Sequence, residues 1–121
     1  MSEGVYFFDT YAFFEIIRGN PSYARFKGCR VITTIFNLAE LNYGLKKEIG
    51  DAAADKITKQ YRTFLVEVAV EDVLGAMTFR RQHKDCSIPD AVGYIISKRF
   101  KVPFLTGDGD FKGMPGVEFV R

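Results

Sequence analysis

The sequence predicts an α/β protein in which a central parallel sheet is covered by helices on both faces. Short apolar or β-branched runs, such as VYFF at 5–8 and RVIT at 30–33, are followed by longer segments whose apolar residues recur at helical spacing. This alternation continues along the chain, and strands that alternate with helices usually pair in parallel. The chain has 121 residues, of which 47% are hydrophobic, enough for one packed domain and too few for two.

The first half of the chain divides at glycines, prolines and capping residues. VYFF at 5–8 is a buried strand, and the helix that follows from Thr10 carries Phe13, Phe14, Ile16 and Ile17. The remaining predicted elements of this half are, in order, a short helix over 21–28, a strand at 30–33, a helix opened by two threonines and ended by Gly50, and a helix over 51–65 that Asp51 caps.

The second half repeats the same alternation. An apolar run at 66–70 predicts a short strand, and helical spacing predicts a helix over 71–84. Ser87 caps the next helix, which has proline and aspartate in its first turn. The last two predicted strands are 102–106 and 117–120.

Four acidic residues fall where parallel sheets form their sites. Asp9 directly follows the first strand, and Asp108 follows the strand at 102–106 with one residue between. Asp90 lies in the first turn of a helix, and Glu40 lies in a mostly hydrophobic helical segment. Since sites in such sheets form at the carboxyl ends of the strands, we expect these four acids to converge at one edge.

Each acid also has an ordinary structural explanation. Asp9 is placed to cap a helix, Asp90 to interact with a helix dipole, and Glu40 to pair with a nearby lysine. Asp108 with Gly109 is typical of a tight hairpin turn, and glycine permits the unusual backbone angles of such turns. The occurrence of all four acids at one edge favours a shared site over four separate coincidences.

Carboxylates gathered at one edge repel one another. At about 4 Å and an effective dielectric constant of about 20, each pair costs about 4 kcal/mol, so the cluster needs protons or a divalent cation. The two cysteines, Cys29 and Cys86, and the single histidine, His83, form no zinc motif. Carboxylate ligands alone select Mg²⁺ or Mn²⁺, which suits phosphodiester hydrolysis.

The same residues match a known family. The ordered segments FFDTYAFFE, NLAELNYGLKK, SIPDAVGYIISKRF and FLTGDGDF resemble the PIN-domain nucleases, and more narrowly the VapC-type toxin ribonucleases. The resemblance covers nearly the whole chain and implies a single PIN domain over residues 1–121. It implies a PIN-like α/β/α sandwich with a central parallel sheet of about five strands, and Mg²⁺- or Mn²⁺-dependent cleavage of RNA.

The resemblance also implies roles for individual residues. The family's four catalytic, metal-binding acids fall on Asp9, Glu40, Asp90 and Asp108. Asp110 matches a less consistent metal ligand, and its position leaves two roles open: binding a second metal, or bonding the loop's backbone amides in an Asx turn.

Three further residues are expected beside the acids or against the substrate. Thr10 belongs to the Asp-Thr start of the first motif, and Thr106 matches a hydroxyl residue of the last one. Arg80 belongs to a basic cluster for which a solvated helix face is the ordinary explanation and phosphate contact the alternative. Where relatives often carry basic residues around the fourth acid, this chain has Gly107 and Gly109.

Several functions compete at this stage. The favoured one is a metal-dependent endoribonuclease that is the toxin of a VapBC-type pair; an RNA-processing PIN nuclease that is not a toxin, or a catalytically idle PIN binding module, are the alternatives. A Toprim- or phosphatase-like domain fits less well. Toprim domains have a glutamate where Asp9 stands, and haloacid-dehalogenase phosphatases have an aspartate where Tyr11 stands.

Partners and location follow from the resemblance and the composition. Toxins of this type usually bind a small antitoxin and usually form homodimers. The net charge is only +2, so RNA binding must come from local patches. The sequence shows no signal peptide and no apolar run near the roughly 18 residues that span a bilayer, so we expect a cytoplasmic protein without a membrane partner and with reduced thiols.

Overall fold

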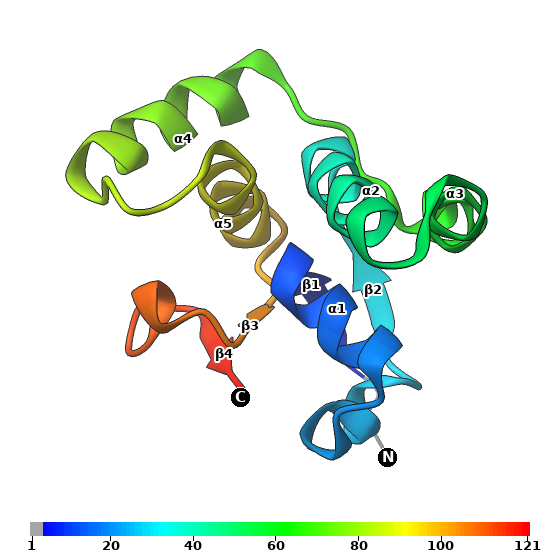
Figure 1. Ribbon diagram of the computed structural model, residues 1–121. Helices are drawn as coiled ribbons and strands as arrows, with labels where there is room; N and C mark the ends of the chain where they lie inside the picture. Colours follow the sequence, from blue (N-terminus) through cyan, green and yellow to red (C-terminus); the bar gives the residue numbers. More distant parts are fainter. Residues whose placement is uncertain (1–3) are drawn as a thin grey trace.

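The computed structural model of the protein describes residues 4–121 (Figure 1). Strands and helices alternate near both ends of this part, but between residues 35 and 100 helices follow one another without a strand, so the predicted alternation is interrupted there. The strands are β1 (Val5–Phe8), β2 (Arg30–Ile32), β3 (Phe104–Thr106) and β4 (Val117–Phe119). The α-helices are α1 (Thr10–Arg18), α2 (Ile35–Ile49), α3 (Asp51–Gln60), α4 (Val70–Gln82) and α5 (Ile88–Phe100), and the 3-10 helices are η1 (Pro21–Phe26), η2 (Arg62–Phe64) and η3 (Gly109–Phe111). No helix in this part of the chain has the length and apolar character needed to cross a membrane.

The strands form one parallel sheet in the order β2-β1-β3-β4. The central strand β1 pairs with β2, with Val5 opposite Arg30, and with β3, with Phe8 opposite Leu105. β4 pairs with β3 and forms the second edge of the sheet. Because every pairing is parallel, all the strands end at the same edge, and the predicted α/β class is confirmed.

The prediction of a strand at 66–70 is wrong. The sheet within residues 4–121 has four strands instead of about five. This region contributes only an isolated parallel bridge between Thr33 and Leu65, next to which Val66 N–H donates to the Thr33 carbonyl at 3.0 Å. Val66 and Val68 pack against the hydrophobic cluster under α5. Their apolar side chains therefore reflect burial against helices and not pairing within the sheet.

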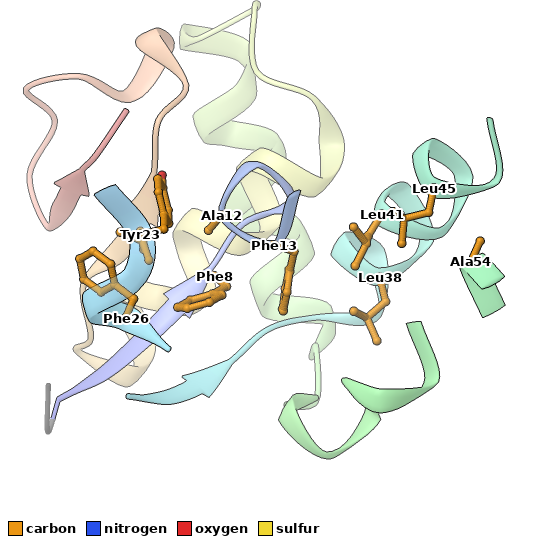
Figure 2. Close-up of a cluster of buried hydrophobic side chains, with 10 residues drawn as sticks. Phe8, Ala12, Phe13, Tyr23, Phe26, Leu38, Leu41, Leu45 and Ala54 are labelled. Carbon is orange, nitrogen blue, oxygen red and sulfur yellow. The ribbon is translucent and has the colours of Figure 1, made fainter. Parts of the chain in front are cut away.

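Two hydrophobic clusters lie on the two faces of the sheet, because successive side chains of a strand point to opposite sides. Phe8 belongs to the cluster that α1, η1, α2 and α3 cover, much of which is shown in Figure 2. Phe7 belongs to the cluster that α4 and α5 cover. At Gly93 of α5, a Cβ atom would lie 2.8 Å from the Phe7 ring, so this glycine lets α5 approach the sheet closely. Among these helices, α1 and α2 start where β1 and β2 end, at the carboxyl edge of the sheet.

Candidate active site

Asp9 lies where the central strand β1 ends and α1 begins. Its Oδ1 accepts a hydrogen bond from Ala12 N–H at 2.9 Å, so the expected cap is present. Its own N–H donates to the Leu105 carbonyl at 3.4 Å, which sets Asp9 beside the end of β3. Only 1% of the Asp9 surface is exposed. A carboxylate thus stands buried at the middle of the sheet edge.

Thr106, the last residue of β3, connects Asp9 to Asp108. Its hydroxyl group hydrogen-bonds to the Asp9 carboxylate, and its Oγ1 accepts from Asp108 N–H at 3.0 Å. Thr106 is fully buried, so this connection lies beneath the surface of the site. The threonine therefore holds the acid that follows β1 next to the acid that follows β3.

The Asp-Gly pair after β3 does not form the hairpin turn that its sequence suggests. Asp108 instead caps η3, and neither Gly107 nor Gly109 has a positive φ angle. Gly107 meets a different requirement, since a Cβ atom there would collide with the Tyr11 ring and lie 2.5 Å from the Val120 carbonyl oxygen. Glycine at 107 is explained by close packing and not by backbone freedom.

Asp110 lies near the other acids but at the surface. The Asp110 carboxylate was one candidate for an Asx bond to the loop's backbone amides. The structure shows such a bond for Asp108 instead, whose Oδ1 accepts from Asp110 N–H at 3.0 Å. The exposed carboxyl group of Asp110 has a raised pKa, chiefly because of the Asp108 charge and also because of Asp85. Asp85, which was not predicted, lines with Asp110 a polar cavity of about 250 Å³ beside the turn between α4 and α5.

Asp90 reaches the same edge from the first turn of α5. It forms a reciprocal capping box with Ser87: Asp90 N–H donates to Ser87 Oγ at 3.1 Å, and Ser87 N–H donates to Asp90 Oδ2 at 3.2 Å. Burial raises the pKa of Asp90 to about 6, with further contributions from the charges of Glu40 and Asp108, against the lowering effect of the Ser87 hydrogen bonds. Asp90 is therefore both a helix cap and a neighbour of the other acids.

Burial also raises the pKa of Asp9, to about 8. The charges of Asp90 and Asp108 act in the same direction, while the hydrogen bonds from Thr106 and Ala12 oppose the shift. These effects place Asp90 within electrostatic reach of Glu40 and Asp108, and Asp9 within reach of Asp90 and Asp108.

A buried polar network positions the start of α2, and with it Glu40. Thr34 caps the helix by accepting from Asn37 N–H at 3.3 Å and donates to Asn37 Oδ1 at 2.7 Å. Asn37 Nδ2 donates to Thr10 Oγ1 at 3.4 Å, directly after Asp9. Glu40 lies three residues beyond Asn37 and so on the same side of α2. The role of Asn37 was not predicted, although a polar residue in this apolar helical segment was a signal.

Arg80 does not lie among the acids. It is exposed on α4, and its Nε donates to the Cys86 carbonyl at 2.9 Å, which secures the turn that precedes Ser87. Burial, and then the charges of Asp90, Asp110 and other aspartates, raise the pKa of the Cys86 thiol in this turn to about 11. Arg80 thus supports the turn before α5, and the Cys86 thiol in this turn is affected by the charges of the acidic site.

The donor groups at this edge suit a divalent cation chemically. Within residues 4–121, no three carboxylate, imidazole or thiol groups are grouped closely enough to hold a metal ion together. Asp9, Asp90 and Asp108 each use one carboxylate oxygen for a capping bond, which fixes the side chain in place. A cation would stabilise the charged carboxylates, whereas burial, and to a smaller extent the neighbouring charges, now raise the pKa values of Asp9 and Asp90.

A four-stranded parallel sheet with acids converging at its carboxyl edge defines a class of α/β protein with an acidic site. The PIN domain family matches residues 6–117, and the chain belongs to this family. A comparison with curated protein sequences finds no match. The family assignment predicted from the short motifs is confirmed.

Solved structures share the fold. VapC20 of Mycobacterium tuberculosis, a Sarcin-Ricin loop cleaving toxin, has a TM-score of 0.80 and 19% identity, covering 96% of this chain and 99% of that one. A toxin-antitoxin complex from Klebsiella pneumoniae has a TM-score of 0.70 and 18% identity, with 93% and 94% covered. VapBC2 from Rickettsia felis, bound to a DNA fragment from its promoter, has a TM-score of 0.71 and 16% identity, with 97% and 99% covered. At these identities the likeness shows the fold.

Proposed function

We propose that this protein, as a single PIN domain over residues 1–121, is an endoribonuclease that hydrolyses RNA phosphodiester bonds with a bound Mg²⁺ or Mn²⁺ ion. The supporting observation is that Asp90 is electrostatically coupled to Glu40, to Asp108 and to Asp9, although these acids come from separate elements. Because these groups are all carboxylates, they favour a hard cation with affinity for phosphate oxygens.

The residues divide into ligands and groups that position them. Asp9, Glu40, Asp90 and Asp108 would hold the cation, which when bound would lower the pKa of the attacking water and stabilise the leaving oxygen. Thr106 keeps Asp9 and Asp108 adjacent through its hydroxyl group. Thr10 joins the start of α1 to Asn37 and so holds α2, with Glu40, against the end of β1.

The biological role we propose is that of a VapC-type toxin in the cytoplasm. It rests on the likeness of fold to VapC20 and to proteins solved as toxin-antitoxin complexes. A small antitoxin that blocks the acidic edge, and a homodimeric state, belong to the same proposal. An antitoxin reading frame next to the gene supports this role, whereas its absence favours an RNA-processing nuclease that is not a toxin.

The activity is tested with a single-stranded RNA oligonucleotide and the purified protein. We expect cleavage with Mn²⁺ or Mg²⁺ and none with excess EDTA, because the carboxylates alone supply no activated water. A phosphate monoester such as p-nitrophenyl phosphate serves as the comparison substrate. Hydrolysis of the monoester without cleavage of RNA contradicts the proposal in favour of a phosphatase. Calorimetry that detects no Mn²⁺ binding favours the idle binding module.

Asp108 and Asp110 are expected to contribute unequally. Asparagine at either position removes a charge, and Asp108→Asn keeps the Oδ1 atom that caps η3. We expect Asp108→Asn to reduce the rate at saturating Mn²⁺ by about 100-fold or more, and Asp110→Asn by less than about 10-fold, because Asp108 is held by Thr106 whereas Asp110 is exposed. Equal losses in the two variants contradict this asymmetry.

A further inference from the structure

An arginine lies against the loop that carries Asp108. Arg121 Nε donates to the Gly107 carbonyl at 3.0 Å, and a Cβ atom on Gly109 would lie 3.6 Å from Arg121 Nη2. The guanidinium group is therefore bonded to the main chain at Gly107, and one of its Nη atoms lies beside Gly109, on the other side of Asp108. Arg121 thus places a positive charge beside Asp108, although the residues directly before and after Asp108 in the loop are glycines.

The fold fixes this arginine by anchoring the residue before it. Val120 N–H donates to the Thr106 carbonyl at 2.9 Å, and the Val120 carbonyl accepts from the Tyr23 hydroxyl at 2.6 Å. The close approach of Gly107 and Val120 leaves no room for a side chain at position 107. The position of Arg121 beside the loop therefore follows from the sheet and its packing.

A second basic side chain, Lys112, lies near the same aromatic ring of β4 as Arg121. Lys112 Nζ and Arg121 Cζ lie 5.6 Å and 5.9 Å from the centre of the Phe119 ring, and both cations are exposed. The ion pairs formed among residues 4–121 involve other basic side chains, not Arg121. Arginine carries five N–H donors, and its Nη groups remain available to a ligand once Nε is bonded to the main chain.

We propose that Arg121 binds a phosphate group of the RNA backbone beside Asp108, and that Lys112 binds a second phosphate along the same edge. The proposal rests on the proposed function, because its ligand is the RNA substrate. Guanidinium and phosphate match in a bidentate geometry, and arginine suits this contact better than lysine. A chain with a net charge of only +2 needs such local cations to bring a polyanion to an acidic edge.

The test measures the binding of a fluorescent single-stranded RNA oligonucleotide by anisotropy, in EDTA, at several salt concentrations. Arg121→Gln is compared with Arg30→Gln, a matched control that removes the same charge from an exposed arginine. Arg30 is the first residue of edge strand β2, whereas Arg121 follows the end of the other edge strand, β4. Because the strands are parallel, Arg30 lies away from the carboxyl edge that carries the acids. A substitution at position 121, unlike a deletion, leaves the main chain unchanged.

We expect Arg121→Gln to raise the Kd roughly 10-fold and to reduce the slope of log K against log salt by about 0.7, the value for one phosphate contact on a single strand. Arg30→Gln is expected to bind as the unmodified protein does, and Arg121→Lys to recover part of the loss. Lys112→Gln is expected to weaken binding in the same way, which keeps the test informative if Arg121→Gln is poorly folded by circular dichroism. Equal effects of Arg121→Gln and Arg30→Gln overturn the proposal.

Cleavage in Mn²⁺, measured separately, distinguishes this proposal from the proposed function. In cleavage, Arg121→Gln is expected to raise KM with little change in kcat, since it loses binding and not chemistry. If the protein cleaves RNA but Arg121→Gln binds normally, the role of Arg121 is wrong and the nuclease assignment stands. If RNA binding depends on Arg121 but no cleavage occurs in any metal, the binding edge stands and the nuclease assignment fails. A protein that neither binds nor cleaves RNA overturns both, and one that cleaves RNA without binding it in EDTA overturns only the role of Arg121.

Discussion

Replacing Asp9 with asparagine is expected to reduce metal-dependent RNA cleavage by at least about 100-fold and to leave the fold intact. Asparagine has nearly the same shape and keeps the oxygen that accepts from Ala12 N–H. What it removes is the carboxyl group that would ionise to bind a cation at the end of the central strand, adjacent to Asp90 and Asp108. Loss of groups that merely orient metal ligands already costs about 10- to 100-fold, so loss of a proposed ligand should cost more.

The measurement compares initial cleavage rates at saturating Mn²⁺, with circular dichroism as the test of folding. Asp51→Asn is the control, because Asp51 also lies at the start of a helix but is exposed, at the beginning of α3, which follows α2 and not a strand. We expect this control to cleave at the normal rate. An Asp9→Asn protein that is folded and fully active sinks the assignment of Asp9 as a ligand.

The second large effect is a loss of stability at high pH in metal-free buffer. The pKa of Asp9 is about 8 in the folded protein, against 3.8 for an ordinary exposed aspartate carboxyl group. Between these values the folded state keeps a proton that the unfolded chain has released, so the free energy of unfolding falls as the pH rises. Each pKa unit corresponds to about 1.4 kcal/mol, which makes the expected total loss several kcal/mol by pH 8. Asp90 contributes in the same direction up to about pH 6.

Urea unfolding in EDTA at pH 5 and pH 8 measures this effect. We expect a clear drop in the midpoint for the unmodified protein and a much smaller drop for Asp9→Asn, whose amide does not titrate. Adding Mn²⁺ at pH 8 is expected to restore the midpoint of the unmodified protein but to act more weakly on the variant, because binding to the folded state stabilises it. Identical pH dependence in the two proteins contradicts the buried, proton-binding state of Asp9.

The acids could be located from the sequence because the signals that place them are local. An apolar run followed by aspartate marks the end of a strand, and Ser87 with Asp90 forms a capping box that spans four residues. The segment at 66–70 shows the limit of such signals. Its apolar residues suit a strand and a buried connection equally well, and packing under α5 decides between them.

By itself, the sequence determined most of the strand and helix segments, apart from the absent strand at 66–70, and the placement of each acid at a strand end or within a helix. Both depend on interactions between residues a few positions apart. Only the tertiary structure decided which groups share the edge of the sheet: Asn37 reaches Thr10, Thr106 joins Asp9 to Asp108, and Arg121 lies beside Gly107. These contacts join separate elements, so they depend on strand order, register and close packing, which no local pattern in the chain specifies.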